Sequence, residues 1–261
     1  MTDVATASEG VAAFYDRLAG EYDAMTLAGK RFVKERPFFR VLVEKYGIAT
    51  AIDAGCGTGF HSLLLAQLGV SVTALDIAEE MLARTARNAH EAGLPVTCVH
   101  AGLTHISGAV PAPVDAVFCM GNTLPHLVDR ADLRMAIAGF AGAIRPGGIL
   151  FAGMLNYERI IARKERIQSV RESGDVTLIR FYDFSATAPG IRFNILRLDR
   201  GGAGMQTELT SVPLAPLDRG TLVDIVAEEG FEEISVFGSV AMEPFDPAES
   251  PDLVILARRG G

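Results

Sequence analysis

The sequence contains no tryptophan, and its three cysteines, Cys56, Cys98 and Cys119, lie far apart without forming a CxxC pair. Neither a disulfide framework nor a cysteine-ligated zinc site is therefore indicated. The five histidines form no group with ligand spacing, so we expect no metal. The composition favours a soluble protein of a reducing compartment, the cytoplasm.

Basic residues are also in deficit, because 24 Lys and Arg face 32 Asp and Glu, a formal net charge of −8. Proteins whose main partner is nucleic acid usually carry a basic face, so we expect no nucleic-acid partner. No apolar run approaches the roughly 18 to 20 residues of a membrane span. The N-terminal MTDVATASEG lacks the basic and apolar regions of a secretory signal. We expect neither membrane association nor secretion.

Short apolar runs alternate with longer helical patterns between residues 47 and 156. This alternation predicts a parallel sheet covered by helices on both faces. The expected strands are 50–55, 70–76, 96–101, 114–121 and 149–155, and the expected helices are 60–69, 78–93 and 130–144. The sequence RPGG is expected to break the chain between the last helix and the last strand.

The flanking segments follow other patterns. Residues 11–46 predict two helical stretches, with Pro37 tolerable only near a helix start. After a helical pattern at 156–172, three strands with glycine-rich turns are expected at 176–184, 191–200 and 205–214, then a helix at 217–231 and strands at 232–240 and 251–259. We divide the chain into an N-terminal helical lid (1–46), an α/β core (47–156), an antiparallel β insertion (157–212) and a C-terminal part of the core sheet (213–261).

The stretch DAGCGTGF, residues 53–60, places a glycine-rich turn between the first strand and its helix. Such a turn directs backbone N–H groups and the positive end of the helix at a ligand. Gly55, Gly57 and Gly59 give G-x-G-x-G, which fits the dinucleotide pattern G-x-G-x-x-G poorly. Asp53 would repel a pyrophosphate and suits a cationic ammonium group. The alternative is a tight turn without a ligand.

Asp76 ends the second strand, 76 − 53 = 23 residues further on. This is close to the interval of about 20 residues expected for a ribose-binding acid. Two ribose hydroxyls can donate to one carboxylate. A helix N-cap before IAEEML is the alternative, and the two roles can coexist. A ligand with a ribose, a cationic amino-acid end and no phosphate is S-adenosylmethionine.

The segments AIDAGCGTGF, VTALDIAEEML, VDAVFCMGNTLPHL and AIRPGGILFAG stand in the order and rough spacing of the class I S-adenosylmethionine-dependent methyltransferases. The chain resembles this family over about residues 48–156. The resemblance implies a Rossmann-like, doubly wound seven-stranded sheet whose last strand is antiparallel, with S-adenosyl-L-homocysteine as the product. The expected cofactor-binding residues are Tyr22, Arg31, Asp53, Gly55, Cys56, Gly57, Gly59, Asp76, Ile77, Gly102 and Leu103.

Two parts of this cofactor site need comment. Many relatives carry an acid after the third strand that accepts from the adenine amino group, and here that position is Gly102. The resemblance then leaves backbone groups around Gly102 and Leu103, and stacking on Ile77, to hold adenine. Arg31 stands where relatives grip the cofactor carboxylate, although an exposed helix residue is the alternative. Tyr22 is assigned to the lid.

CMGNTLPHL and LNYERI are similar to stretches of glycine and sarcosine N-methyltransferases. Members that hold a glycine carboxylate have an arginine just before NY, where this chain has Leu155. We therefore expect a larger or less charged acceptor than glycine. Asn122 is the candidate that orients the acceptor, the alternative being a turn residue. His126 is a candidate general base, the alternative being a packing residue.

The sequence thus predicts a methyltransferase acting on a small molecule, on nitrogen rather than oxygen. Two alternatives stay open: O-methylation of a phenol or hydroxyl with His126 as base, and a non-catalytic S-adenosylmethionine-binding module. The oligomeric state is open, with a homodimer as one option. The insertion offers aromatic and cationic candidates of which at most half can face inward, and none is assigned: Arg180, Phe181, Tyr182, Arg192, Asn194 and Arg197.

Overall fold

The computed structural model describes residues 4–26, 28–110, 113–184, 190–202 and 204–261. Residues 1–3 and 27 of the predicted lid, and residues 185–189 and 203 of the predicted insertion, lie outside the described residues.

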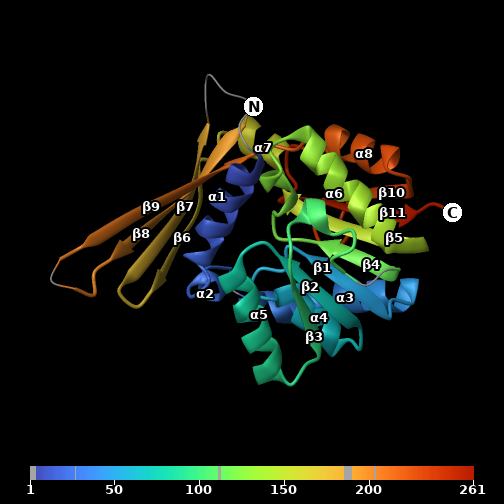
Figure 1. Cartoon of the computed structure of the whole chain (residues 1–261). Helices are drawn as coiled ribbons and strands as arrows, with labels where there is room; N and C mark the ends of the chain where they lie inside the picture. The colour runs from blue at the N-terminus through green and yellow to red at the C-terminus, as the bar shows by residue number, and fades with distance from the viewer. Residues whose placement is uncertain (1–3, 27, 111–112, 185–189, 203) are drawn as a thin grey trace.

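A seven-stranded sheet forms the centre of the molecule (Figure 1). Its strands are β1 (Thr50–Ala54), β2 (Ser71–Asp76), β3 (Val96–His100), β4 (Val114–Cys119), β5 (Ile144–Leu155), β10 (Phe231–Phe237) and β11 (Asp252–Arg259). Their order is β10-β11-β5-β4-β1-β2-β3, and β11 is antiparallel to both of its neighbours. The expected sheet with an antiparallel last strand is confirmed. Since β1 pairs in parallel with both β2 and β4, the strand order reverses there, which opens a crevice at the carboxyl ends of the strands.

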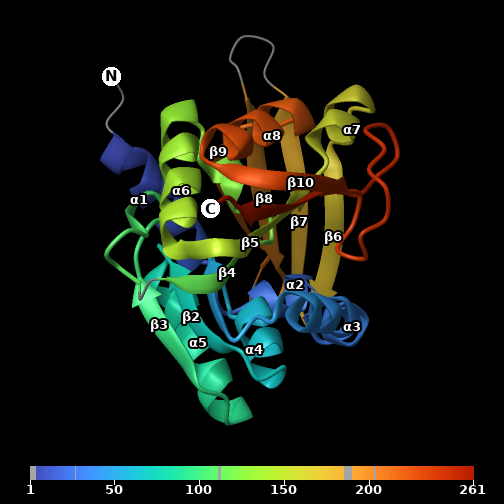
Figure 2. The same ribbon diagram turned by 90° about the vertical axis from the view of Figure 1, so that its right-hand side faces the viewer.

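Helices cover both faces of this sheet, as Figures 1 and 2 show. One face carries α3 (Ala28–Tyr46), α4 (Phe60–Gln67) and α5 (Glu79–Ala92), and the other carries α6 (Arg130–Ala143) and α8 (Arg219–Glu228). Successive strand residues point to opposite faces. Phe118 of β4 therefore packs under α3 and α4, whereas Val117 packs under α6 and α8. No helix among the described residues is long and apolar enough to cross a membrane.

A second sheet stands apart from the first (Figure 1). It contains β6 (Ile167–Ser173), β7 (Val176–Phe184), β8 (Ile191–Asp199) and β9 (Gln206–Leu214), in that order and all antiparallel. Helices α1 (Val4–Asp16), α2 (Tyr22–Thr26) and α7 (Tyr157–Ala162) belong to the region between the sheets. Phe14 of α1 and Tyr157 of α7 share a buried cluster with Leu178, Tyr182 and Phe193 of the second sheet. The insertion is thus joined to the core through an apolar layer.

The helical pattern at 156–172 is wrong in its second half. The helix α7 ends at Ala162, and residues 167–173 form β6. The reason is tertiary pairing, since β6 forms a hairpin with β7 through a turn in which Gly174 has φ 57°. The insertion therefore has four strands rather than three.

Two other predicted boundaries are also wrong. Pro37 lies inside α3 rather than near a helix start. It faces solvent, where water can bond the carbonyl group that the missing N–H leaves free. The strand expected at 149–155 begins at Ile144, because the RPGG residues continue β5 with a register shift against β4.

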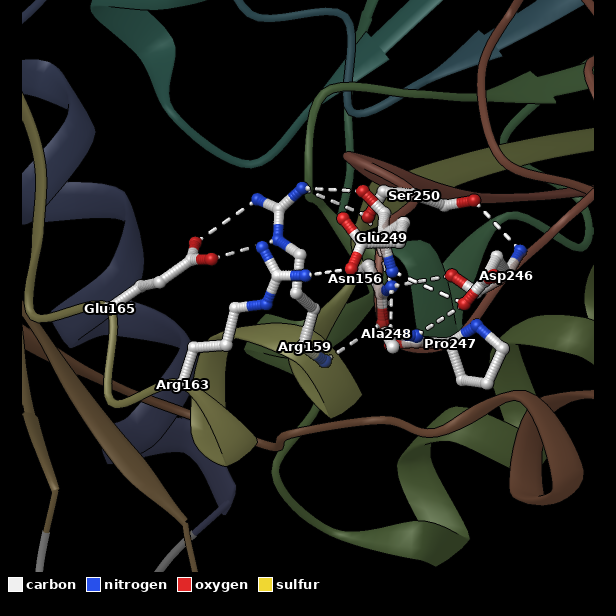
Figure 3. Close-up of polar contacts among 9 residues, drawn as sticks. All are labelled: Asn156, Arg159, Arg163, Glu165, Asp246, Pro247, Ala248, Glu249 and Ser250. Atoms are coloured by element: carbon white, nitrogen blue, oxygen red, sulfur yellow. Dashed lines mark hydrogen bonds and ion pairs between the residues drawn. The ribbon is translucent and has the colours of Figure 1, made fainter.

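Asn156 fixes the loop that precedes β11 (Figure 3). Its buried side chain caps α7 by accepting from the Arg159 N–H at 3.3 Å. Its amide nitrogen donates to the carbonyls of Pro247 at 3.1 Å and Ser250 at 3.0 Å. Arg159 adds a bond to the Ser250 carbonyl at 3.0 Å. One side chain thereby positions two segments at the carboxyl edge of the sheet.

We predict that Asn156→Ala lowers the free energy of unfolding by about 2 kcal/mol, because it leaves buried carbonyl groups without a donor. Urea unfolding followed by circular dichroism measures the change. Arg163→Ala is the control, since its ion pair with Glu249 is exposed and such pairs contribute little. Equal losses of unfolding free energy in both variants would contradict the proposed role of Asn156 in holding this loop.

Candidate functional site

A cavity of about 430 Å³ lies at the carboxyl ends of β1 to β4. Parallel strands end at the same edge, which is why loops far apart in sequence meet there. The predicted cofactor-binding residues that line it are Tyr22, Arg31, Gly55, Cys56, Gly57, Asp76, Ile77, Gly102 and Leu103. Asp53 and Gly59 are not among the described residues of its wall.

The glycine-rich loop has two kinds of glycine. At Gly57, with φ 57°, an added Cβ would meet only the Tyr22 ring at 3.7 Å, so this glycine leaves its backbone open toward the cavity. At Gly59, with φ 88°, an added Cβ would lie 2.8 Å from Thr85 of α5 and 2.9 Å from Leu63. Gly59 therefore lets α4 and α5 approach each other, whereas Gly57 lets a ligand approach the loop.

Asp76 connects the loop to β2. One carboxylate oxygen accepts the Gly57 N–H at 2.7 Å and the other accepts the Ala78 N–H at 2.9 Å. Burial raises the pKa of Asp76, and these two N–H bonds act against that shift. The N-cap residue of α5 is Ala78. The alternative in which Asp76 is the N-cap residue of this helix is therefore wrong. The carboxylate also lines the cavity, where its remaining lone pairs can accept from a ligand.

Asp53 lies on the other side of the loop. In β1 it alternates with Ile52 and Ala54, which places its side chain on the face covered by α4. Its carboxylate accepts from the Ser62 hydroxyl at 2.6 Å, and burial raises its pKa. Its observed contact is therefore with the helix behind the loop, and contact with a ligand ammonium stays a prediction.

Ile77, Gly102 and Leu103 line the cavity together, and their contact with adenine stays a prediction. An added Cβ on Gly102 would lie 3.4 Å from the Ile77 side chain. Thr104, His105 and Asp132 also line the cavity and were not predicted. Thr104 and His105 directly follow Leu103, so their position after β3 could have indicated them. Asp132 comes from the first turn of α6, and no sequence pattern connects it to this edge.

Arg31 is held in place by neighbours on both sides. Its Nε donates to Glu35 one helical turn on at 2.7 Å, and its guanidinium lies 4.3 Å from the centre of the Phe60 ring. Glu35 is buried and its pKa is lowered, with burial opposed by hydrogen bonds from His61 and Arg31. Arg31 is half-buried rather than an exposed helix residue. Its grip on a cofactor carboxylate stays a prediction.

A second cavity, of about 650 Å³, lies between the core and the second sheet. It shares Tyr15, Tyr22, Thr26, Arg31, Met120 and Gly121 with the first. Its further walls include residues of β5, of the second sheet and of the 239–252 segment: Gly153, Met154, Leu155, Gln168, Arg180, Tyr182, Phe193, Ile195, Ser239, Val240, Ala241, Glu243, Pro251 and Asp252. Two cavities that meet at six residues suit a reaction between two bound molecules.

Asn122 and His126, the predicted catalytic residues, face different cavities. Asn122 lines the second cavity with φ 73°, and its amide nitrogen and oxygen lie 2.8 and 3.0 Å from the Tyr157 hydroxyl. It is therefore a turn residue that also reaches the cavity. His126 lines the first cavity, where its Nε2 lies 2.8 Å from the Tyr15 hydroxyl. Burial lowers the pKa of His126 to about 4.

Comparison with known proteins agrees with this geometry. Residues 51–148 match a family described as a methyltransferase domain. The chain is 27% identical to a glycine/sarcosine N-methyltransferase of Parasynechococcus marenigrum (strain WH8102), over 93% of this chain and 82% of the relative. It is 30% identical to a glycine/sarcosine N-methyltransferase of Halorhodospira halochloris, over 57% of this chain and 55% of the relative. The chain thus spans about half the length of the second relative.

The fold has solved counterparts. An S-adenosylmethionine-dependent methyltransferase from Clostridium acetobutylicum ATCC 824 superposes with a TM-score of 0.80 over 95% of this chain and 99% of its own, at 14% sequence identity. At that identity the likeness concerns the fold alone. The matched methyltransferase domain and this fold support a class I S-adenosylmethionine-dependent methyltransferase. The more specific similarity is that to glycine/sarcosine N-methyltransferases.

We predict that Asp76→Ala weakens the binding of S-adenosylhomocysteine about 10- to 100-fold, because a buried carboxylate that accepts ribose hydroxyls is lost. Isothermal titration calorimetry measures the affinity, and a thermal melt shows whether the variant is folded. Glu79→Gln, at an exposed position three residues on, is the matched control and should bind as the wild type does. Unchanged affinity in a folded Asp76→Ala protein would place the ribose elsewhere.

Asp252 provides a prediction on pH, because burial and the neighbouring Glu35 raise its pKa from 3.8 to about 6. The folded protein then binds this proton more tightly than the unfolded chain. Protonation of Asp252 therefore stabilises the fold at low pH, and this stabilisation is lost as pH rises from about 4 to 6. We expect Asp252→Asn to be more stable than the wild type by about 1 to 2 kcal/mol at pH 7.5, and the gain to vanish near pH 4. Urea unfolding at both pH values measures this. A gain in stability that is the same at both pH values would contradict a raised pKa of Asp252 in the folded protein.

Proposed function

We propose that this methyltransferase transfers the methyl group to a nitrogen of a small molecule larger than glycine. The supporting observation is the shared wall of the two cavities, where Tyr15, Tyr22 and Met120 face both. A donor in the first cavity and an acceptor in the second would meet there. In-line displacement requires this arrangement, because the attacking and leaving atoms lie on opposite sides of the methyl carbon.

The first cavity fits S-adenosylmethionine by its chemistry. The Asp76 carboxylate is placed to accept from ribose hydroxyls, and the open backbone at Gly57 permits close approach of the ligand. Arg31 supplies a cation for the amino-acid carboxylate. Ile77 and Leu103 supply apolar contact for adenine. Thr104, His105 or Asp132 could accept from its amino group in place of the acid that Gly102 replaces.

S-adenosylmethionine supplies a methyl group on a sulfonium, which leaves as a neutral thioether without an acid. When an amine lone pair forms the new N–C bond, the S–C bond breaks and the ammonium product then loses a proton to solvent. The protein therefore has to align the acceptor and exclude water. Tyr15 and Tyr22, in contact at 6.1 Å between ring centres, would close the junction of the cavities. Asn122 would orient the acceptor from the opposite side.

The second cavity supports an acceptor larger than glycine. Its volume of about 650 Å³ lies in the range of sites for drug-sized ligands. Leu155 lines it and provides no cation. Its N–H donates to the Asn122 amide oxygen at 3.3 Å, so position 155 adjoins the predicted orienting residue. A bare glycine carboxylate there would be desolvated without a partner.

A panel of acceptors tests the proposal. Purified protein is incubated with S-adenosylmethionine and primary amines, secondary amines, phenols, glycine or sarcosine, and products are identified by mass spectrometry. We expect N-methylated products from amines larger than glycine, with kcat/KM for glycine lower by about 100-fold or more. Efficient methylation of glycine would contradict the acceptor proposal. Binding of the cofactor without any turnover would favour the non-catalytic alternative.

A pH profile separates N- from O-methylation with His126 as base. Since the pKa of His126 is lowered to about 4, the imidazole is neutral and a weak base throughout the range above about pH 5.5. We expect the ratio of His126→Ala to wild-type kcat/KM to stay constant from about pH 5.5 to 8. Tyr15→Phe, which removes the hydrogen-bond partner of His126, should show the same constancy. A wild-type inflection near pH 6 to 7 that disappears in His126→Ala would favour the oxygen acceptor.

A further inference from the structure

Strand β7 presents one charged residue on an otherwise apolar face. Its alternate residues Val176, Leu178, Tyr182 and Phe184 belong to the buried cluster between the sheets. Arg180 occupies the middle position of the same face, and it lines the second cavity together with Tyr182. A cation in the middle of an apolar strand face costs solvation free energy unless something compensates for it.

No carboxylate compensates for Arg180 among the described residues. Its Nε donates to the Ser169 hydroxyl at 2.7 Å, which is a neutral partner. Burial lowers its pKa, and the nearby groups that oppose this shift are Tyr22, Tyr182 and Tyr15. These tyrosines are neutral near pH 7, because burial raises their pKa values. The Arg180 guanidinium therefore lines the cavity without forming an ion pair among the described residues, although Glu35, Glu243 and Asp252 line the same cavity.

Arginines of α3, α7 and β8 are paired with carboxylates, and one of them, Arg31, also lines the second cavity. Arg31 donates to Glu35 at 2.7 Å, and Arg197 of β8 contacts Glu21 at 3.1 Å. Arg159 contacts Glu165 at 3.0 Å. Arg180 differs from all three, although it is placed where a bound acceptor would lie. This difference argues against a purely structural role.

We propose that Arg180 binds a carboxylate group of the methyl acceptor, so that the substrate is an amine that carries a carboxylate on an apolar body. This inference rests on the proposed function and names the class of its acceptor. A planar guanidinium can bind a carboxylate through two parallel hydrogen bonds. With Nε bonded to Ser169, the terminal nitrogens of Arg180 serve this role.

Neighbouring groups support a monoanion with an apolar body. The buried Tyr182 side chain packs against Tyr157 and lines the same cavity, where its hydroxyl can donate to the carboxylate. Phe193, Ile195 and Met154 provide apolar walls. Glu35, Glu243 and Asp252 line the cavity as well and offset its cations Arg31, Lys34 and Arg180. A dianionic phosphate would therefore meet more repulsion there than a monoanionic carboxylate.

The test uses full-length protein saturated with S-adenosylhomocysteine, whose affinity is measured first. The probes are benzoate, 3-phenylpropionate and 4-phenylbutyrate, each against its amide and its phosphonate of equal length, titrated by calorimetry. We expect one or more acids to bind about tenfold or more tightly than the matching amide and phosphonate. Arg180→Met should abolish this preference, and Arg180→Lys should retain part of it.

Arg192→Met is the matched control, because Arg192 is exposed in β8, where its side chain alternates with the inward-facing Ile191 and Phe193. It should keep the preference for the acid. Arg180→Met should keep its affinity for S-adenosylhomocysteine and should not melt below the wild type, since an uncompensated charge is removed from an apolar face. These measurements separate acceptor binding from a structural role.

Three results would overturn the inference. One is the absence of any preference for the acid in the wild type, including the case in which no probe binds. The second is a preference that persists in Arg180→Met. The third is a loss of S-adenosylhomocysteine affinity in Arg180→Met, which would assign Arg180 to the donor. If the wild type fails to bind S-adenosylhomocysteine at all, the proposed function fails first, and the two failures are thereby distinguished.

Discussion

Two backbone N–H groups that donate to the Asp76 carboxylate hold the wall of the first cavity in place. Gly57 belongs to the loop after β1 and Ala78 to the turn after β2, so one side chain fixes two strand ends at 2.7 and 2.9 Å. A carboxylate that is so deeply buried is tolerated only when such donors are aimed at it. The parallel pairing of β1 with β2 brings the donors together. The position of Gly57 under the Tyr22 ring, and thus the shape of the cavity, depends on this interaction.

The two halves of the site come from different layers of the fold. The core sheet forms the first cavity, proposed for the donor, through its strand ends, whereas the second sheet forms much of the second cavity, proposed for the acceptor, through β7 and β8. Tyr15 links the halves, since it faces both cavities and contacts His126 from α1. The Asn122–Tyr157 contact links β4 to the segment after β5 in a similar way. In the proposed reaction, changes in the second sheet would therefore alter the acceptor while the first cavity stays intact.

The sequence predicted the core sheet and most of the donor cavity, because strand ends in a parallel sheet converge whatever lies between them. Asp76 and Gly57 could be placed at this edge from their positions in the sequence, and Ile77 from the resemblance to the family. Asp53 could not, since the side of the sheet that it faces depends on its packing against Ser62. The strand β6 was missed because its pairing with β7 is tertiary and overrides a helical pattern. The inward direction of Arg180 was likewise undetermined, since alternation gives two faces without saying which one is buried.

The location of the acceptor cation bears on the length of the substrate. A cation at position 155 would adjoin Asn122, because the Leu155 N–H bonds to the Asn122 amide, and it would hold a carboxylate beside the predicted orienting residue. That suits an amine separated from its carboxylate by a single carbon. Arg180 instead belongs to β7 of the second sheet and lines the same cavity as Leu155 of β5. A substrate that reaches from Arg180 to the junction at Tyr15 and Tyr22 has to span the cavity, and the apolar walls between these points would contact its middle part. A cation on the insertion, with none at position 155, thus favours a longer acceptor in the proposed reaction.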